Sequence, residues 1–295
     1  MRVLVLGGTG VIGSAIVSEL VARGHSVIGL ARSEASARTL ASAGATPLAG
    51  DIGLPEAWIR RLPHIEAVIH AACDFSTEMA AVDGGLLDVL LPALASQPTR
   101  VRLIYTGGCW LYGPTGNDIA DEETPFDPLP AFAWMVSHLT RVLKAREIEG
   151  VVIHPAMVYA TDGGGVFTRF ARDARDGRPI RIVADEAIRW PLVRADDLAR
   201  LYALALERAA SGSSYIGAAI DGVPVGAIVR AFARRFGTGE PKLDIVSEAA
   251  IAAELGAWAR GYARDQLLSD AKARRELGWK PQHLDPVGEI LALHA

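Results

Sequence analysis

Cysteine is almost missing from this chain of 295 residues, which has only Cys73 and Cys109. Two isolated cysteines provide neither a disulfide framework nor the ligand spacing of a metal site, so we expect no metal centre. A chain that lacks disulfides fits a reducing compartment, and the cytoplasm is the expected location.

Long apolar runs and an excess of one charge are also lacking. No uninterrupted apolar stretch approaches the roughly 20 residues that cross a bilayer, and the formal net charge is only -4. We therefore expect no nucleic acid and no membrane among the partners of this chain. The first residues read as a strand, so no secretion signal is expected either.

Half of the residues are hydrophobic and 22% are charged, a composition typical of globular proteins. Segments of strand length alternate with segments of helical periodicity through residues 1–162. This alternation predicts an α/β fold, a Rossmann-type doubly wound parallel sheet with right-handed crossovers. We expect residues 1–162 to form the dinucleotide-binding domain. Residues 163–295 are expected to form mainly a substrate-binding lobe, with some segments returning to the main sheet.

The segment most informative about function is Gly7-Gly8-Thr9-Gly10-Val11-Ile12-Gly13, which follows the apolar run 3–6. Glycines spaced by three residues between a strand and a helix predict a dinucleotide site. They allow a tight turn, close approach of the backbone to a pyrophosphate, and close packing of helix on strand, while the helix N-terminus favours the phosphate. The alternative interpretation is a glycine turn kept only for packing.

The end of the second predicted strand, 26–30, bears on the choice of cofactor. An acid that binds the ribose 2′-hydroxyl of NAD is usual at this place, but this chain has Ala31-Arg32-Ser33. Arg32 suits a 2′-phosphate through paired, charge-assisted hydrogen bonds, and Ser33 adds a hydroxyl. We therefore expect NADP(H) in preference to NAD(H); the alternative is that Arg32 is a solvated loop charge.

The remaining pattern places further elements along the chain. Strands are predicted over 46–49, 67–70, 101–106 and 151–154, and helices over 11–23, 34–43, 55–61, 77–96 and 131–147. Gly84, Gly85 and Pro92 weaken the prediction of the helix 77–96. After a glycine-rich connection at 162–165, short strand-like pieces lie near Ile180 and Val193. Helices are predicted over 166–176, 196–209, 225–236, 248–263 and 269–277.

Several segments together resemble the extended short-chain dehydrogenase/reductase superfamily, in its NAD-dependent epimerase/dehydratase branch. Besides the glycine loop, these segments are His70-Ala71-Ala72, Leu111-Tyr112-Gly113, Val158-Tyr159-Ala160, Val193-Arg194-Ala195-Asp196-Asp197 and Leu277-Gly278-Trp279-Lys280-Pro281. The resemblance implies a homodimer formed through the helices 77–96 and 131–147. Together with the glycine loop and the strand ends, it implies a cofactor bound by Gly7, Thr9, Gly10, Val11, Ile12, Gly13, Arg32, Ser33, Asp51, Ile52, Ala71, Ala72 and His138.

The same resemblance implies a catalytic Ser or Thr, and a Tyr four residues before a Lys. In this chain those positions hold Gly108, Trp134 and His138. The spacing places Trp134 and His138 on one helix face, but an indole N–H only donates a hydrogen bond and cannot exchange its proton near neutral pH. The standard Tyr–Lys reaction is therefore excluded in its usual form.

Three side chains are candidates for the missing chemistry. His138 carries an imidazole, which exchanges protons near neutral pH and can bind a ribose hydroxyl, or it is a packed histidine. Tyr112 follows the fifth predicted strand, where ligands bind in such sheets, and either donates a proton or packs its ring. Thr106 either offers a hydroxyl to the substrate or caps the strand end.

The substrate side has five candidate residues, each with a packing or solvated alternative: Asp74, Cys109, Trp134, Trp190 and Arg194. A flat indole such as that of Trp134 suits an aromatic ligand. His154-Pro155 stands where the resemblance implies Arg-Pro, which weakens the expectation of a nucleotide-sugar diphosphate as ligand.

These residues indicate an NADP(H)-dependent oxidoreductase or epimerase/dehydratase-like enzyme with non-standard catalytic residues. Its substrate is expected to be a small carbonyl, alcohol or sugar-like compound. The alternative comes from another functional class: a catalytically silent NAD(P)(H)-binding redox sensor or partner module, which the loss of all three standard groups favours.

Overall fold

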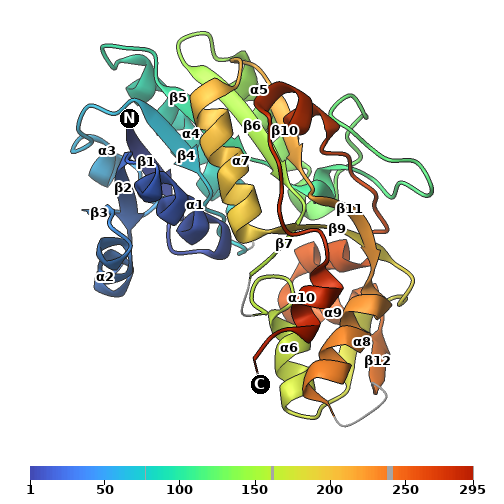
Figure 1. Cartoon of the computed structure of the whole chain (residues 1–295). Coiled ribbons are helices and arrows are strands. Elements are labelled where there is room, and N and C mark those ends of the chain that lie inside the picture. Colours follow the sequence, from blue (N-terminus) through green and yellow to red (C-terminus); the bar gives the residue numbers. More distant parts are fainter. Residues whose placement is uncertain (77, 161–162, 238–241, 295) are drawn as a thin grey trace.

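A computed structural model describes residues 1–76, 78–160, 163–237 and 242–294. Its main body is a seven-stranded sheet in the order β10-β6-β5-β4-β1-β2-β3, in which every neighbouring pair is parallel (Figure 1). The strands are β1 (Arg2–Leu6), β2 (Ser26–Ala31), β3 (Thr46–Ala49), β4 (Ala67–His70), β5 (Arg102–Thr106), β6 (Glu149–Pro155) and β10 (Ser214–Gly217). This topology confirms the predicted fold class.

Helices cover both faces of the sheet, which explains the apolar run in its central strand. They are α1 (Val11–Ala22), α2 (Glu34–Ser42), α3 (Glu56–Ile59), α4 (Met79–Ala95), α5 (Trp134–Lys144) and α7 (Ala195–Arg208). Val3 and Val5 pack with α1 and α7 on one face, whereas Leu4 and Leu6 pack with α4 and α5 on the other. All four side chains are fully buried, as expected for a strand inside a parallel sheet.

The helix α4 forms in spite of residues that disfavour it. It continues through Gly84, Gly85 and Pro92 because packing of an apolar face outweighs weak propensity. That face consists of four buried leucines, Leu86, Leu87, Leu90 and Leu94. The predicted first residue, Thr77, lies outside the described residues. The predicted helix 131–147 divides into a 3-10 turn, Pro130–Phe132, and α5.

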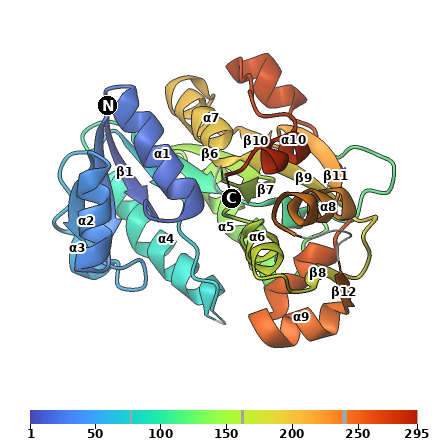
Figure 2. The same ribbon diagram turned by 60° about the horizontal axis from the view of Figure 1, so that its bottom comes forward.

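The rest of the chain forms a smaller lobe beside the main body (Figures 1 and 2). Its elements are β7 (Met157–Tyr159), α6 (Thr168–Arg175), β8 (Ile180–Val183), β9 (Arg189–Arg194), β11 (Ile220–Pro224), α8 (Val225–Phe236), β12 (Leu243–Val246), α9 (Glu248–Leu255) and α10 (Pro286–Leu291). They include a three-stranded sheet, β11-β9-β7, and a parallel pair, β12-β8.

The chain crosses between the two parts more than once. α7 and β10 follow the first lobe elements but belong to the main body, since β10 pairs with β6. The proposed boundary between residues 162 and 163 stays a prediction, and residues 161–162, including Asp162 of the predicted connection, lie outside the described residues. Among the described residues, no helix is both long enough and apolar enough to cross a membrane.

Two predicted helices of the lobe are shorter than expected. The segment 248–263 is interrupted because Gly256 has φ of +106°, a conformation that favours glycine. α9 therefore ends at Leu255, and a 3-10 segment, Ala257–Ala263, follows it. The segment 269–277 becomes helical at Ala271, later than predicted, and its main part is a π-helical turn, Ala273–Leu277.

Candidate functional site

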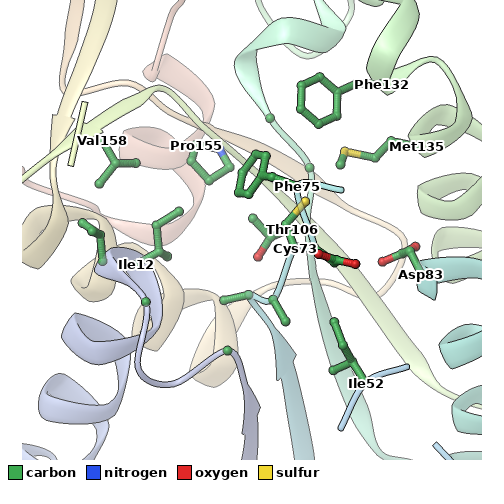
Figure 3. A pocket seen from close by; sticks show the side chains of 18 of the residues that line it. Ile12, Ile52, Cys73, Phe75, Asp83, Thr106, Phe132, Met135, Pro155 and Val158 are labelled. Carbon is green, nitrogen blue, oxygen red and sulfur yellow. The ribbon is translucent and has the colours of Figure 1, made fainter. Parts of the chain in front are cut away.

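A cleft of about 920 Å³ lies where the carboxyl ends of β1, β4 and β5 meet the lobe. The glycine loop and the end of β2 line one part of it, and the 3-10 segment Ala257–Ala263 of the lobe lines another. Figure 3 shows Ile12 on one side of this cleft and Thr106, Phe75 and Asp83 further along it. Ligands bind at this edge in open α/β sheets, so the cleft is the candidate site.

The three loop glycines have distinct roles. Gly7 has φ of +82°, and a Cβ there would lie 2.6 Å from the Ala71 carbonyl oxygen. A Cβ on Gly13 would lie 2.0 Å from the Gly7 carbonyl oxygen, so this glycine lets α1 pack on the loop. A Cβ on Gly10 would meet only the Gly7 carbonyl oxygen, at 3.5 Å. Gly10 therefore leaves open space at the N-terminus of α1, where backbone N–H groups attract a phosphate.

Ten of the predicted cofactor contacts line the cleft, and three do not. The ten are Gly7, Thr9, Gly10, Val11, Ile12, Arg32, Asp51, Ile52, Ala71 and Ala72. Gly13 instead packs under the loop. His138 lies beside the cleft, where its ring meets the carboxylate of Asp83. Ser33 caps α2, where its Oγ accepts a hydrogen bond from the Ser36 N–H at 3.2 Å. Ser36 itself lines the cleft, a contact that the sequence did not indicate.

Arg32 is suited to an anionic ligand. It is exposed, lines the cleft and has no hydrogen-bonded or charged partner among the described residues. Asp51 is partly buried near it in the lining, and its Oδ1 accepts a hydrogen bond from the Gly53 N–H at 2.8 Å. The residues present thus fit a dinucleotide: a glycine cradle for phosphates and a free guanidinium for a further phosphate.

Gly108 and Trp134, which the resemblance places at the Ser and Tyr positions, both face the cleft. Gly108 lines it, and a Cβ there would meet nothing within 4 Å. Trp134 also lines the cleft, but its Nε1–H already donates to the Ala131 carbonyl at 2.9 Å. Neither residue offers the cleft a group that exchanges protons.

The buried carboxylate of Asp83 is the centre of a polar network that the sequence did not indicate. Its Oδ1 lies 2.8 Å from Nε2 of His70, and its Oδ2 lies 2.6 Å from Nδ1 of His138. The Tyr105 hydroxyl donates to Oδ2 at 2.8 Å. Asp83 and Tyr105 line the cleft, whereas His138 does not. The available signal was an acid on the same helical face as the buried leucines of α4.

This network determines the charge of Asp83. Burial acts to raise the pKa of its carboxyl, but the hydrogen bonds from His70, His138 and Tyr105 outweigh burial and lower that pKa. Burial is the main cause that raises the pKa of the Tyr105 hydroxyl well above its usual value, and the charge of the Asp83 carboxylate is the next cause. Asp83 is therefore an anion, and Tyr105 a neutral hydrogen-bond donor.

Thr106 lies at the end of β5 and lines the cleft, and its role as a substrate hydroxyl stays a prediction. Its Oγ1 lies 2.6 Å from the hydroxyl of Tyr202 on α7. Tyr202 is fully buried and has no other hydrogen-bonded partner among the described residues. Either hydroxyl can be the donor in this pair, and when Tyr202 donates to Thr106 the Thr106 proton is free for another acceptor.

Tyr112 does not reach the cleft, which corrects the expectation that it donates a proton there. Its side chain is buried, and its hydroxyl has no partner among the described atoms. Its ring meets that of His154 edge-on, at 5.6 Å between centroids. Burial raises the pKa of Tyr112 and lowers that of His154 to about 4. Both residues therefore remain neutral and packed inside the protein.

Two of the predicted substrate residues lie away from the cleft, which corrects their assignment. Trp190 stacks on Phe170 at 5.7 Å, and its Nε1–H donates to the Tyr262 carbonyl. Arg194 is held by Asp196 through both carboxylate oxygens. These contacts give both side chains structural roles.

The other three predicted substrate residues, Asp74, Cys109 and Trp134, do line the cleft, together with Cys73. Burial raises the pKa of Cys109 to about 12. Cys73 is exposed as a residue, but loss of water around its thiol, with the charges of Asp83 and Asp74, raises its pKa to about 12. Neither thiol is therefore an activated nucleophile.

Five side chains form one aromatic surface of the cleft, here called the aromatic wall: Phe75, Trp110, Phe132, Trp258 and Tyr262. The Phe75 and Trp258 rings are 5.2 Å apart, and Trp110 stacks on Trp258 at 6.2 Å. Trp258 and Tyr262 come from the lobe, whereas Trp110 follows β5, so both parts of the molecule build the wall. Of the chain's six tryptophans, three line this cleft: Trp110, Trp134 and Trp258.

Charge is distributed unevenly along the cleft. Arg32 is the sole cationic side chain among the described lining residues, and it lies in the part that contains the glycine loop. The lining beyond that part carries the acids Asp74 and Asp83. The wall therefore offers no Arg or Lys that would bind a diphosphate.

One group of side chains has the spacing of a metal site, but it lies outside the cleft. In the part of the chain that the structure describes, this group is Asp196, Asp197 and His283. Asp196 pairs with Arg194, and Asp197 pairs with Arg200 and accepts hydrogen bonds from the backbone N–H groups of residues 282 and 283. Protein donors thus already satisfy these carboxylates.

Comparison with known proteins places these observations among related chains. A family model described as NAD dependent epimerase/dehydratase family matches residues 3–217. The chain is 28% identical over 289 residues to an uncharacterized protein of Schizosaccharomyces pombe, and the matched residues cover 96% of each chain. It is also 28% identical over 312 residues to a 3-diazoavenalumate denitrifying reductase from Streptomyces sp, covering 96% of this chain and 97% of the relative.

Among solved structures, a human epimerase family protein with NADPH has a TM-score of 0.81 at 20% identity and covers 99% of each chain. This likeness concerns the fold alone.

Proposed function

We propose that this chain, which belongs to the NAD-dependent epimerase/dehydratase family, is an NADP(H)-dependent reductase of small, largely apolar carbonyl compounds. The observation that carries the proposal is a single cleft that runs from the glycine loop and Arg32 to an aromatic wall without cations. The first part suits a dinucleotide, and the second suits an apolar or aromatic molecule.

The preference for NADP(H) follows from Arg32. Its guanidinium lines the cleft without a protein partner, and no acid replaces it at the end of β2. A guanidinium binds a phosphate through two parallel hydrogen bonds, whereas an acid would repel the 2′-phosphate. The human structure named above contains NADPH, which agrees with this preference, but the preference rests on Arg32.

The class of substrate follows from the other part of the cleft. Rings of the aromatic wall provide a large apolar surface, and the lining there lacks the cations that hold a nucleotide-sugar diphosphate. A relative over nearly the whole chain is named as a reductase of a diazo compound, which supports reduction as the reaction class. Reduction is therefore favoured here over epimerisation or dehydration of a nucleotide sugar.

The hydroxyl of Thr106 is the group that this chain offers to a substrate carbonyl. When bound, NADPH supplies the hydride. Thr106 donates a hydrogen bond to the carbonyl oxygen, and Tyr202 holds the Thr106 Oγ1 in the orientation that makes this possible. The C=O π bond breaks, a C–H bond forms, and the oxygen takes a proton from water. Hydrogen bonding to the developing charge replaces the acid that Trp134 cannot provide.

Two measurements test the cofactor part of this proposal. Titration of the purified protein with NADPH and NADH, followed by fluorescence, should show tighter binding of NADPH. Arg32→Gln should remove most of this difference, whereas Arg38→Gln should not, because Arg38 pairs with Glu34 on the exposed side of α2 and does not line the cleft. Equal binding of both cofactors by the unaltered protein would refute the preference.

The catalytic part is tested with a panel of aryl and alkyl ketones and NADPH. Thr106→Val should lower kcat/KM about 10²-fold, by analogy with loss of one oxyanion donor, and Tyr202→Phe should lower it less, since Thr106 keeps its hydroxyl. NADPH binding without any reduction across the panel would favour the alternative, a silent redox sensor. The predicted homodimer and cytoplasmic location stay predictions.

A further inference from the structure

The network around Asp83 has a feature that the proposed reaction does not use. Asp83 presents a carboxylate to the cleft (Figure 3), although three protein groups already hold it. An ionised carboxylate has about four acceptor sites. His70 occupies one of them, on Oδ1, while His138 and Tyr105 share Oδ2. Acceptor capacity for one more donor therefore remains on Oδ1.

The placement of His138 makes this capacity significant. The family resemblance places a Lys at position 138, where it would donate hydrogen bonds to the nicotinamide ribose. In this chain the His138 ring instead lies outside the cleft lining, with Nδ1 at 2.6 Å from Asp83 Oδ2. Its Cε1 and Nε2 face the backbone of Gly84, where a Cβ would lie 3.4 and 3.5 Å from them. His138 thus supports Asp83 instead of reaching into the cleft.

The lining around Asp83 points to a hydroxyl donor as the ligand group. Asp83 and Tyr105 line the cleft together with Thr106 and Trp134. The proposed function places the reacting group of the substrate beside Thr106. No Lys or Arg among the described lining residues is available there to pair with Asp83. The side chain of Asp83 is 10% exposed and lines the cleft, so a bound molecule can reach only a small part of it. A neutral hydroxyl fits this opening.

We propose that the Asp83 carboxylate accepts a hydrogen bond from a hydroxyl of the nicotinamide ribose, in place of the donor that a Lys would provide. This inference rests on the proposed function, because it requires a bound dinucleotide. His70, His138 and Tyr105 are positioning residues that keep the carboxylate ionised and fixed. A hydroxyl of the substrate has the same donor chemistry, so the test must separate the two sources.

Three ligands, used without substrate and followed by calorimetry, locate the contact. NADPH contains the nicotinamide and its ribose. 2′-Phospho-ADP-ribose contains this ribose without the nicotinamide, and 2′,5′-ADP lacks both the ribose and the nicotinamide. Asp83→Asn should weaken the first two by about tenfold or more, as expected for loss of a hydrogen bond to a charged group. Binding of 2′,5′-ADP should stay unchanged.

Two further variants distinguish a contact from a structural role. Asp88→Asn on the same helix is the matched control, because Asp88 pairs with Arg141 on the surface and lies outside the cleft lining. It should leave all three affinities unchanged. His138→Asn keeps a donor near Asp83 and should retain most of the affinity for 2′-phospho-ADP-ribose. A loss in His138→Asn larger than that in Asp83→Asn would assign the ribose to His138 and overturn the proposal.

The unaltered protein gives an independent readout if Asp83→Asn does not fold. In NMR spectra, 2′-phospho-ADP-ribose should shift the ring signals of His70 and His138, whereas 2′,5′-ADP should not. Equal effects of both ligands, or equal weakening of all three ligands in Asp83→Asn, would refute the ribose contact while leaving the proposed reductase intact. If only added substrate shifts these signals, the hydroxyl belongs to the substrate, and the proposal is wrong. Failure of NADPH to bind the unaltered protein would refute the proposed function itself.

Discussion

Replacing single loop glycines by alanine should separate cofactor binding from stability. Gly10 has φ of -78° and ψ of 171°, which any residue adopts, and its Cβ would meet only the Gly7 carbonyl oxygen, at 3.5 Å. Alanine is a poorer N-cap than glycine, which lowers the unfolding free energy by up to about 1 kcal/mol. Alanine also reduces the conformational entropy of the unfolded chain, which raises the unfolding free energy by about 0.4–1 kcal/mol. We expect the unfolding free energy of Gly10→Ala to stay within about 1 kcal/mol of the original.

Gly13→Ala should behave in the opposite way. Its Cβ would lie 2.0 Å from the Gly7 carbonyl oxygen and 2.9 Å from the Gly8 Cα, so the backbone of α1 or of the loop must move. Overpacking of this kind costs about 1–3 kcal/mol or more, and the better helix propensity of alanine returns about 1 kcal/mol. Urea unfolding followed by circular dichroism should therefore show a clear loss of stability for Gly13→Ala.

The binding assay completes the comparison. In Gly10→Ala a methyl group occupies the open space at the N-terminus of α1, so the dissociation constant for NADPH should rise at least about tenfold, or about 1.4 kcal/mol. Gly85→Ala is the control, since its Cβ on the exposed side of α4 meets nothing within 4 Å. If Gly10→Ala binds NADPH within about twofold of the original, no phosphate approaches this backbone, and the assignment of the loop is refuted.

Three further predictions test other parts of the site. Tyr112→Phe should leave kcat and stability nearly unchanged, because the hydroxyl has no partner; a large fall in kcat would restore Tyr112 as proton donor. His154 has a folded-state pKa lowered from 6.5 to about 4, so its contribution to stability is present above pH 6.5 and is lost as the pH falls towards 4. Between pH 7.5 and 5 the original protein should lose about 2 kcal/mol more unfolding free energy than His154→Leu, and parallel losses in urea titrations would contradict this. Phe75 is 56% exposed, so Phe75→Ala should raise KM for aryl ketones without changing NADPH binding or melting temperature, and an unchanged KM would remove it from the substrate site.

The glycine loop could be predicted from the sequence because its information is local. A strand, a turn and a helix that follow one another within 22 residues fix the place of each glycine, and ten predicted contacts line the cleft in the structure. The fold class was predictable for a related reason, since strand and helix periodicity is visible in each segment. The assignment of Gly108, Trp134 and His138 to the catalytic positions rests on the family resemblance and stays a prediction.

The remaining part of the site depends on contacts between residues far apart in sequence. Asp83 and His138 are 55 residues apart, and Thr106 and Tyr202 are 96 apart, so no local pattern could show that each pair forms a hydrogen bond. Trp190 and Arg194 looked equally suited to a substrate until packing gave their polar groups protein partners.

The sequence by itself therefore determined the fold class and the cradle for the dinucleotide, because these follow from local periodicity and spacing. Only the tertiary structure decided which side chains face the cleft, which carboxylate is held as an anion and which hydroxyls pair with each other. Those properties depend on burial and on hydrogen-bonded partners, and both are set by the packing of distant segments.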